Sequence, residues 1–260
     1  MASSWTAVRR SGTDPDGGIR RSVRLFRSFL TEQSDPEGFY TLIADDCVTL
    51  VSPHLRLEGA LVADFGGGPG FYSEAFRRAG ARTVLIDADI DELRLHGRRA
   101  PGAVVGRAER APLADESVDV AFSSNLLEHV ADLGAVADQM LRVVKPGGHA
   151  VLSYTIWLGP WGGHETSPWH YLGGHRAARR YAAKHGKAPK NQFGTSMFAA
   201  SVGDGLRWLA TRPDLTVLDL RPRYLPAWSR PLLKVPLLRE LLTWNLWIVV
   251  RKSVPKDLPE

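Results

Sequence analysis

Four glycines and a proline follow an apolar run that ends in an acid, in the stretch VADFGGGPGFYS from Val62 to Ser73. Glycines at a turn from strand to helix let a ligand approach the main-chain N–H groups closely. Asp64 stands two residues before the first of these glycines, and Asp87 ends the next apolar run. A carboxylate at the second position can accept hydrogen bonds from ribose hydroxyls. Together these residues predict a site for a nucleotide-derived ligand.

The acid and the proline of this turn help to separate two classes of ligand. A carboxylate beside a pyrophosphate is unfavourable, whereas S-adenosylmethionine brings an ammonium group and a sulfonium that a carboxylate attracts. Pro69 removes one N–H group, which costs little when there is no pyrophosphate to bind. The turn therefore favours S-adenosylmethionine, and a nicotinamide-dependent oxidoreductase is the alternative.

Candidate proton acceptors lie in two later segments. His129 belongs to NLLEHV, and HETSPWHY contains His164, Glu165 and His170. A hydroxyl that is to be alkylated must lose its proton to a base or be polarised by a metal. One histidine could be that base with Glu165 orienting it, or these side chains could only pack their loops. Two imidazoles and a carboxylate could hold a metal, but their spacing matches no helical ligand pair, so we expect none.

The elements that must position these residues alternate along the chain. Short apolar runs indicate strands in ALVADFG, RTVLIDA, GAVVG, SVDVAFSSN, GGHAVLSYT, LTVLDLRP and NLWIVVRK. Amphipathic runs between them indicate helices in YSEAFRRAG, DIDELRLHGRR and LGAVADQMLRVV. The alternation predicts an α/β fold: a Rossmann-like, doubly wound, mostly parallel seven-stranded sheet with an N-terminal helical lid and an insertion after the fifth strand.

The predicted organisation is a disordered tail over 1–18 and a single domain over 19–260. Within the domain we expect a helical lid (19–58), a cofactor-binding core (59–155), an insertion that holds the acceptor or acts as a lid (156–212), and the final strands and helix (213–260). Outside the core we expect one helix that begins at Ile19. Four others are expected over Phe39–Val51, His175–His185, Val202–Thr211 and Leu232–Leu242.

Composition narrows the class of protein further. The 260 residues are 44% hydrophobic, and Cys47 is the single cysteine, which excludes an internal disulfide and a cysteine-built metal site. We expect Cys47 to be a small apolar filler on a helix. The opening residues resemble no secretory leader, and no apolar run is long enough to span a bilayer. The sequence therefore predicts a cytoplasmic protein.

The net charge of +5 is unevenly distributed. Ten Lys/Arg stand against thirteen Asp/Glu between Leu61 and Leu152, so the positive surplus lies outside this core. Basic flanks suit an anionic acceptor, a nucleic acid or a membrane surface, or they only keep the protein soluble. Arg20, Arg24 and Arg27 form one stripe of the first helix, which could make peripheral membrane contact or cover the cofactor cleft.

The ordered motifs resemble those of the class I S-adenosylmethionine-dependent methyltransferases, specifically the type 11 branch that acts on small molecules. Asp64, Gly66, Gly68 and Gly70 match the D-x-G-x-G-x-G pattern of that family. VLIDAD, VVGRAERAPLADESVDVAFSSN, NLLEHV and LRVVKPGG follow in family order over about residues 61–155. The chain as a whole looks like an uncharacterised bacterial subgroup.

The resemblance implies which residues hold the cofactor. The backbone from Gly66 through Gly67 and Gly68 to Gly70 would pass under the methionine portion, with Asp64 near its ammonium group. The remaining implied contacts are Asp87 on the ribose, Ala88, Ala108 and Glu109 at the adenine, and Ser124 and Asn125 at the methionine end, with Tyr40 reaching the cofactor carboxylate from the lid.

One position departs from the family pattern. Arg107 stands where family members usually have an aspartate that accepts from the adenine amino group, and arginine cannot accept a hydrogen bond. A backbone carbonyl or Glu109 would take over this role, or Arg107 would stack on the ring.

The implied activity is methyl transfer to a small molecule, a glycan or a lipid precursor, at oxygen. Trp157, Trp161, Trp169 and Tyr171 could wall the acceptor pocket or simply pin a long loop. A nucleic-acid methyltransferase is the second hypothesis, which SSNLLEHV disfavours because it lacks the N/D-P-P-Y pattern of base methylation. The last hypothesis is a protein that binds the cofactor without catalysing a reaction. The acceptor and the oligomeric state stay open.

Overall fold

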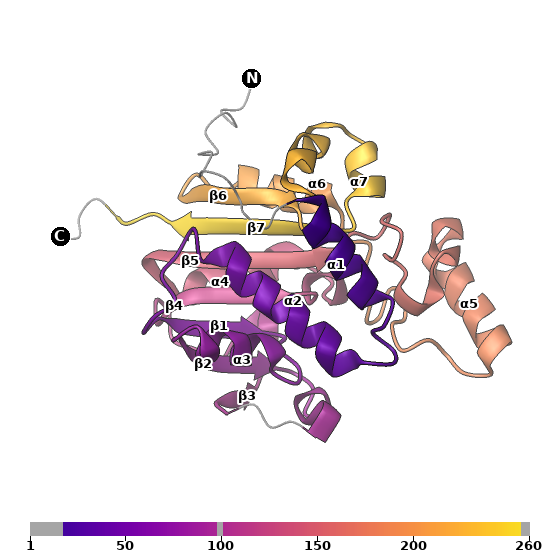
Figure 1. Ribbon diagram of the computed structural model, residues 1–260, viewed down its shortest axis with the longest axis horizontal. Helices are drawn as coiled ribbons and strands as arrows, with labels where there is room; N and C mark the ends of the chain where they lie inside the picture. The colour runs from indigo at the N-terminus through magenta and orange to yellow at the C-terminus, as the bar shows by residue number, and fades with distance from the viewer. Residues whose placement is uncertain (1–17, 98–100, 256–260) are drawn as a thin grey trace.

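The computed structural model describes residues 18–97 and 101–255 and contains a seven-stranded sheet in the order β3-β2-β1-β4-β5-β7-β6 (Figure 1). The neighbours from β3 to β5 run parallel, whereas β7 is antiparallel to both β5 and β6. The strands are β1 Leu61–Phe65, β2 Arg82–Asp87, β3 Ala103–Val105, β4 Val118–Ser124, β5 Val144–Thr155, β6 Leu215–Pro222 and β7 Asn245–Lys252. The predicted fold class is confirmed.

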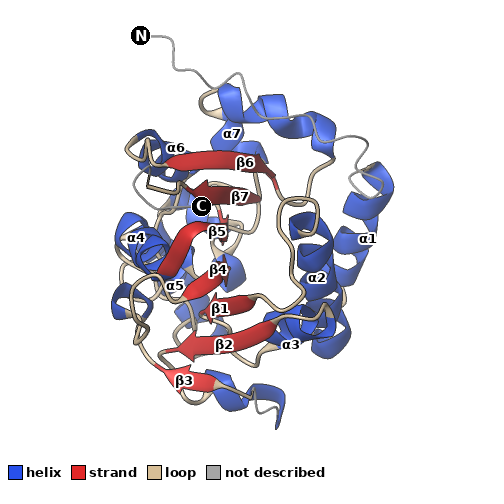
Figure 2. Ribbon diagram, turned by 90° about the vertical axis from the view of Figure 1, so that its left-hand side faces the viewer, coloured by secondary structure: helices blue, strands red, loops and turns tan. Residues whose placement is uncertain are grey.

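Helices cover both faces of this sheet (Figure 2). The α-helices are α1 Ile19–Phe29, α2 Pro36–Val51, α3 Phe71–Arg78, α4 Leu133–Val143, α5 Gly174–His185, α6 Val202–Ala210 and α7 Leu238–Leu242. The 3-10 helices are η1 Glu92–Gly97, η2 Ala108–Arg110, η3 Leu127–His129, η4 His164–Thr166, η5 Trp169–Leu172 and η6 Ala227–Lys234.

Alternation along the strands divides the core between the two faces, because successive side chains of a strand point to opposite sides. In β1, Val62 packs in the cluster formed with α2 and α3, whereas Ala63 and Phe65 pack in the cluster formed with α4 and α6. Asp64 falls on the α3 side, where its carboxylate meets Ser73. The parallel strands bring the carboxyl ends of β1, β2, β4 and β5 to one edge of the sheet.

The helices α1 and α2 are fixed to the sheet by buried charges. Arg21 and Asp46 are 4% and 3% exposed and form two hydrogen bonds, of 2.7 and 2.6 Å. Arg21 also donates to the carbonyl of Arg223, the residue after β6, at 3.0 Å. A buried arginine needs several partners because its charge loses the solvation of water. Cys47 is buried on α2 as expected, and its sulfur contacts the guanidinium of Arg223.

Two of the predicted helices are wrong. The segment DIDELRLHGRR forms only the 3-10 helix η1 in its described part, because Asp87 and Asp89 each accept a backbone N–H two residues later and so hold turns. The helix expected over Leu232–Leu242 is divided into η6 and α7. Pro236 has no N–H to donate and forces Val235 into an extended conformation.

The other expected helices are present with small shifts at their ends, and β6 and β7 match their predicted segments. The predicted disordered tail lies outside the described residues, except for Gly18. In the described ranges, no helix combines the length and apolarity that a membrane crossing requires.

Candidate functional site

The glycine turn links β1 to α3 with three glycines at positive φ. Gly66, Gly68 and Gly70 have φ of +68°, +47° and +85°, values that side chains with a Cβ adopt only at a cost. A Cβ on Gly68 would meet nothing within 4 Å, so the backbone there faces open space. The turn therefore presents bare main chain at the N-terminus of α3, as a cofactor cradle requires.

Asp64 is enclosed directly beneath this turn. Its carboxylate is 1% exposed, and Oδ2 accepts a hydrogen bond from the Ser73 hydroxyl at 2.8 Å. A Cβ on Gly67 would come within 2.7 Å of Oδ2 and 2.6 Å of Leu85 Cγ, so this position has no room for a side chain. Burial raises the pKa of Asp64 to about 6, although the Ser73 bond opposes the shift.

The second oxygen of Asp64 has no hydrogen-bond partner among the described residues. A buried carboxylate oxygen without a donor is costly, and a cation arriving beside it would remove that cost. This orphan atom beside bare backbone fits the ammonium group of an amino acid, which is the reading that the sequence favoured.

Asp87 ends β2 next to the glycine turn. One of its carboxylate oxygens accepts from Gly68 N at 2.9 Å and the other from Asp89 N at 2.9 Å. The side chain stays partly exposed, and the following Ala88 is exposed. Asp87 is therefore accessible beside the glycine turn, where the ribose of a cofactor bound over this turn could reach its carboxylate.

The residues expected at the adenine lie after β3. Ala108 is buried at the start of η2, whereas Arg107 and Glu109 are exposed and pair with each other at 3.7 Å. The charge of Arg107 is thus directed toward Glu109. The contacts predicted for Ala108 and Glu109 stay predictions.

Ser124 and Asn125 follow at the end of β4 and are already bonded within the protein. The Ser124 hydroxyl donates to Tyr72 Oη at 3.0 Å and accepts from Arg223 Nη1 at 2.8 Å. Asn125 has φ of +56°, and its side-chain oxygen accepts from Asn245 at 2.8 Å. Both side chains are therefore held rigidly at the carboxyl end of the strand.

Arg223 is a residue that sequence reasoning missed. It is 0% exposed, and its guanidinium donates to the hydroxyls of Ser124 and Ser153 and to the Cys47 sulfur. These partners come from β4, β5 and α2, so no local pattern in the sequence could have indicated the arrangement. Arg223 therefore holds the Ser124 hydroxyl in place through a hydrogen bond.

Tyr40, expected to reach the cofactor, borders the glycine turn from α2. Its ring stacks on Phe71, the first residue of α3, with centroids 5.5 Å apart. Its hydroxyl donates to Glu32 at 2.7 Å. A bond from Tyr40 to a cofactor carboxylate would have to replace this one, and its role stays a prediction.

Two histidines from different motifs meet beyond the ends of β4 and β5. His129 lies in η3 and His164 begins η4; their rings are edge-on with centroids 5.3 Å apart. The buried carboxylate of Glu128 completes the group, since one ligand atom of each side chain lies within 4.8 Å of the others. We call these three residues the polar cluster. Sequence reasoning missed Glu128, although it stands beside His129 in NLLEHV.

The hydrogen bonds of the polar cluster leave free atoms inside it. Glu128 Oε1 accepts from Thr155 N at 3.1 Å, whereas Oε2 and His164 Nε2 are buried with no partner among the described residues. His129 Nδ1 lies 2.7 Å from the Ser196 carbonyl. His164 adopts φ of +48°, a strained conformation that is found most often at functional sites. Burial lowers the pKa of His164, so its imidazole stays neutral.

Glu165 and His170 lie outside the polar cluster. Both oxygens of Glu165 accept from Asn191, at 2.8 and 2.9 Å. Although burial opposes it, these bonds hold the pKa of Glu165 below its ordinary value. His170 is 1% exposed with Nε2 3.2 Å from the Gly159 carbonyl, and burial lowers its pKa. These contacts support loop packing, and a catalytic role for either residue stays a prediction.

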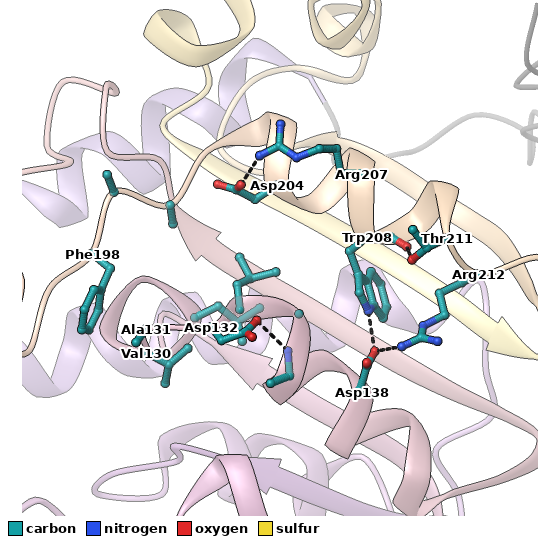
Figure 3. A pocket seen from close by; sticks show the side chains of 16 residues that line it. Val130, Ala131, Asp132, Asp138, Phe198, Asp204, Arg207, Trp208, Thr211 and Arg212 are labelled. Carbon is teal, nitrogen blue, oxygen red and sulfur yellow. Dashed lines mark hydrogen bonds and ion pairs between the residues drawn. The ribbon is translucent and has the colours of Figure 1, made fainter.

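A separate hollow of about 740 Å³ lies between α4 and α6 (Figure 3). Its charged groups already pair with one another: Arg207 with Asp204, and Asp138 with Arg212 and the Trp208 indole. The residues that the sequence assigns to a cofactor do not line it. The hollow therefore has no chemistry in common with the glycine turn.

Comparison with known proteins gives the family of the chain. The family described as a methyltransferase domain matches residues 63–152. An uncharacterized methyltransferase of Mycobacteroides abscessus is 46% identical over 246 residues, which cover 90% of this chain and 94% of that protein. The chain belongs to the S-adenosylmethionine-dependent methyltransferases.

Solved structures agree on the fold of this methyltransferase. An S-adenosylmethionine-dependent methyltransferase from Mesorhizobium loti has a TM-score of 0.54 and 20% identity and covers 80% of this chain and 98% of its own. A [4+2]-cyclase has a TM-score of 0.51 and 15% identity, covering 81% and 82%. Because the same fold carries different chemistry, the structural likeness alone does not give the reaction.

The methyltransferase uses S-adenosylmethionine, and the geometry of the chain fits it. The orphan oxygen of Asp64 could receive its ammonium group, the backbone at Gly68 is open, and the acid at the end of β2 is at hand for its ribose. Family membership sets aside the nicotinamide-dependent alternative.

Proposed function

We propose that this methyltransferase methylates a hydroxyl oxygen of a small molecule, a glycan or a lipid precursor, and that His129 removes the hydroxyl proton. The polar cluster is the observation that carries the proposal. Two of its members, Glu128 and His129, follow Asn125 by three and four residues, at the edge of the sheet where α/β folds bind their ligands.

The hydrogen bonds of the two rings assign their protons. A carbonyl oxygen only accepts, so His129 Nδ1 carries the proton that faces Ser196, and Nε2 keeps its lone pair. The Asn191 amide nitrogen lies 3.5 Å from His164 Nδ1 and can only donate, which leaves the proton of His164 on Nε2. His129 is therefore the base, and His164 Nε2–H faces the same space as the free oxygen of Glu128.

The groups of the polar cluster divide the work of the transfer. S-adenosylmethionine, when bound, supplies a methyl carbon made electrophilic by a sulfonium. The hydroxyl oxygen forms a bond to this carbon as the carbon–sulfur bond breaks and its electron pair stays on sulfur. The hydroxyl proton passes to His129 Nε2, and the buried carboxylate of Glu128 stabilises the imidazolium that forms. The products are a methyl ether and S-adenosylhomocysteine.

The test combines product identification with His129→Gln. The protein is incubated with methyl-labelled S-adenosylmethionine and with lipid, polysaccharide and small-molecule fractions of a mycobacterial extract, and the labelled product is identified by mass spectrometry. We expect a methyl ether. His129→Gln should lower turnover by about 10²- to 10⁴-fold, because that is the usual contribution of a general base, and leave the cofactor Kd unchanged.

His185→Gln is the matched control, since this exposed histidine ends α5 away from the polar cluster. Thermal unfolding of each variant checks that it folds. A methylated nitrogen or carbon in the product, or full turnover by folded His129→Gln, would refute the proposal.

The same three side chains favour one second candidate, a bound divalent metal that polarises the hydroxyl. A carboxylate and two imidazoles are common ligands of zinc and non-haem iron, and within the described ranges Glu128 Oε2 and His164 Nε2 have no partner. Metal analysis of the purified protein and turnover after chelation separate the two. A stoichiometric metal whose removal abolishes turnover supports the metal; undiminished turnover in chelator supports the base.

A further inference from the structure

Two segments far apart in the sequence expose large apolar side chains. Ile19, the first residue of α1, and Leu30, the residue after this helix, are 62% and 65% exposed. Between β6 and β7, Trp228 and Leu237 are 73% and 76% exposed, with Leu238 and Leu241 beside them on α7. Single exposed apolar residues are ordinary, but a set that gathers on neighbouring elements marks an interaction surface. We call these six residues the apolar surface.

Trp244 joins the two halves of this surface. Its ring lies 5.9 Å from Phe26 of α1 and 4.6 Å from Trp161. It also lines an apolar pocket of about 520 Å³ together with Leu225, Trp228 and Leu232 of the second segment. The pocket therefore adjoins the second half of the apolar surface, which contributes Trp228 to its lining. The η6–α7 segment lies beside α1 (Figure 1).

The exposed charges within the two segments are mainly basic. Residues 19–31 include Arg20, Arg24 and Arg27, all exposed, and no acid. In residues 225–239 Lys234 is exposed, whereas Arg230 pairs with the buried Asp219 at 2.9 Å and Arg239 with Glu240 at 3.2 Å. Two acids adjoin these segments and are engaged within the protein: Glu240 accepts from the backbone N–H groups of Val202 and Gly203, and Glu32 accepts from the Tyr40 hydroxyl.

We propose that the apolar surface docks on a bilayer that contains anionic lipids and that the pocket takes a hydrocarbon chain from it. Tryptophan and leucine beside lysine and arginine are the composition of interfacial membrane-binding segments. A second copy of the chain would fit less well, since two cationic surfaces repel each other. The sequence indicated the arginine stripe of α1 alone; the η6–α7 half and the pocket come from the structure.

The position of the pocket relates docking to the reaction. Trp244 directly precedes Asn245, whose side chain donates to Asn125 at the predicted methionine end of the cofactor site. A lipid-linked acceptor anchored by its chain would thus present its polar part at the edge of the sheet that carries the site. The docking itself does not depend on which atom is methylated.

The test measures binding of the full chain to vesicles by co-sedimentation. We expect binding to vesicles of equimolar phosphatidylglycerol and phosphatidylcholine and little binding to phosphatidylcholine alone. Arg24→Glu should lower the partition coefficient about fivefold or more, because each basic residue at an anionic surface contributes about that factor. Leu237→Ser should lower it about tenfold, because an apolar side chain then no longer leaves water.

Arg179→Glu and Leu172→Ser are the matched controls, since both residues are exposed on the insertion and lie outside the apolar surface. Cofactor binding by calorimetry verifies that every variant folds, and vesicle binding is read without any methylation. No binding of the wild type to anionic vesicles, or equal losses in the control variants, would overturn the proposal. So would a dimer in sedimentation equilibrium that Leu237→Ser dissociates, which would assign the surface to a second copy.

Discussion

Asp64→Asn is expected to stabilise the free protein at neutral pH while it weakens cofactor binding. The Asp64 carboxylate is buried with one orphan oxygen, and burial raises its pKa to about 6. An acid whose folded pKa lies above its unfolded value stabilises the fold below the unfolded value, near 4, and this contribution is lost as pH rises through about 6. The difference of about 2 pH units corresponds to about 3 kcal/mol, an upper bound for one buried group.

The assay is urea unfolding of the wild type and Asp64→Asn at pH 4.5, 6 and 7.5, expressed as the difference between the two proteins. The amide can still accept from Ser73, so the packing changes little. We expect the difference to grow in favour of the variant by about 2 kcal/mol from the lowest to the highest pH, because part of the shift already acts at pH 4.5. Calorimetry should show the opposite for the cofactor: the wild type binds more tightly above pH 6, where Asp64 is ionised, and the variant loses this dependence.

Asp214→Asn, at an exposed acid before β6, is the control for general effects of charge on unfolding. Two results would show that ionisation of the buried carboxylate does not destabilise the fold. One is a stability difference that stays constant with pH, and the other is an Asp64→Asn protein less stable than the wild type at pH 7.5. The inference that the ionised Asp64 destabilises the free protein and therefore attracts the ammonium group of the cofactor would then be wrong.

Two further predictions concern the other buried and rim charges. Asp87→Asn should weaken S-adenosylmethionine binding by about 2–4 kcal/mol in calorimetry, because hydrogen bonds to a charged group contribute about 1.5–3 kcal/mol each; an unchanged Kd would contradict the expected ribose contact. Asp46→Asn should lower the free energy of unfolding by about 3–5 kcal/mol, because it leaves Arg21 and Arg223 as buried cations without a carboxylate. Arg223→Met should lower the free energy of unfolding clearly less than Asp46→Asn does, because the Arg21–Asp46 ion pair stays intact. Equal losses of unfolding free energy in the same urea titration would refute this account.

The parts of the fold that could be predicted are those fixed by local patterns. The apolar runs of β1, β6 and β7 and the glycines of the first turn depend on neighbours in the sequence, so their spacing was enough. The division of Leu232–Leu242 was also readable in principle, because Pro236 stands inside the apolar run.

The polar cluster and the Arg223 contacts depend on the path of the chain through space. His129 and His164 were each singled out, but their separation of 35 residues gave no sign that the rings would meet, and His170 in the same motif faces Gly159 instead. Arg223 reaches Cys47 across 176 residues of sequence. Such contacts follow only from the packing of the sheet against its helices.

Arg21, Asp46 and Arg223 form a group with two cations and one anion inside the protein, which limits how this part of the chain can change over evolutionary time. Loss of Asp46 leaves two buried positive charges without a carboxylate, and loss of Arg21 removes the two hydrogen bonds that it donates to Asp46. A viable descendant must therefore alter the three positions in a compensated order or keep them all. Mutational scanning that tolerates the double replacement of Arg21 and Asp46 by apolar residues, and rejects each single one, is the signature of such a constraint.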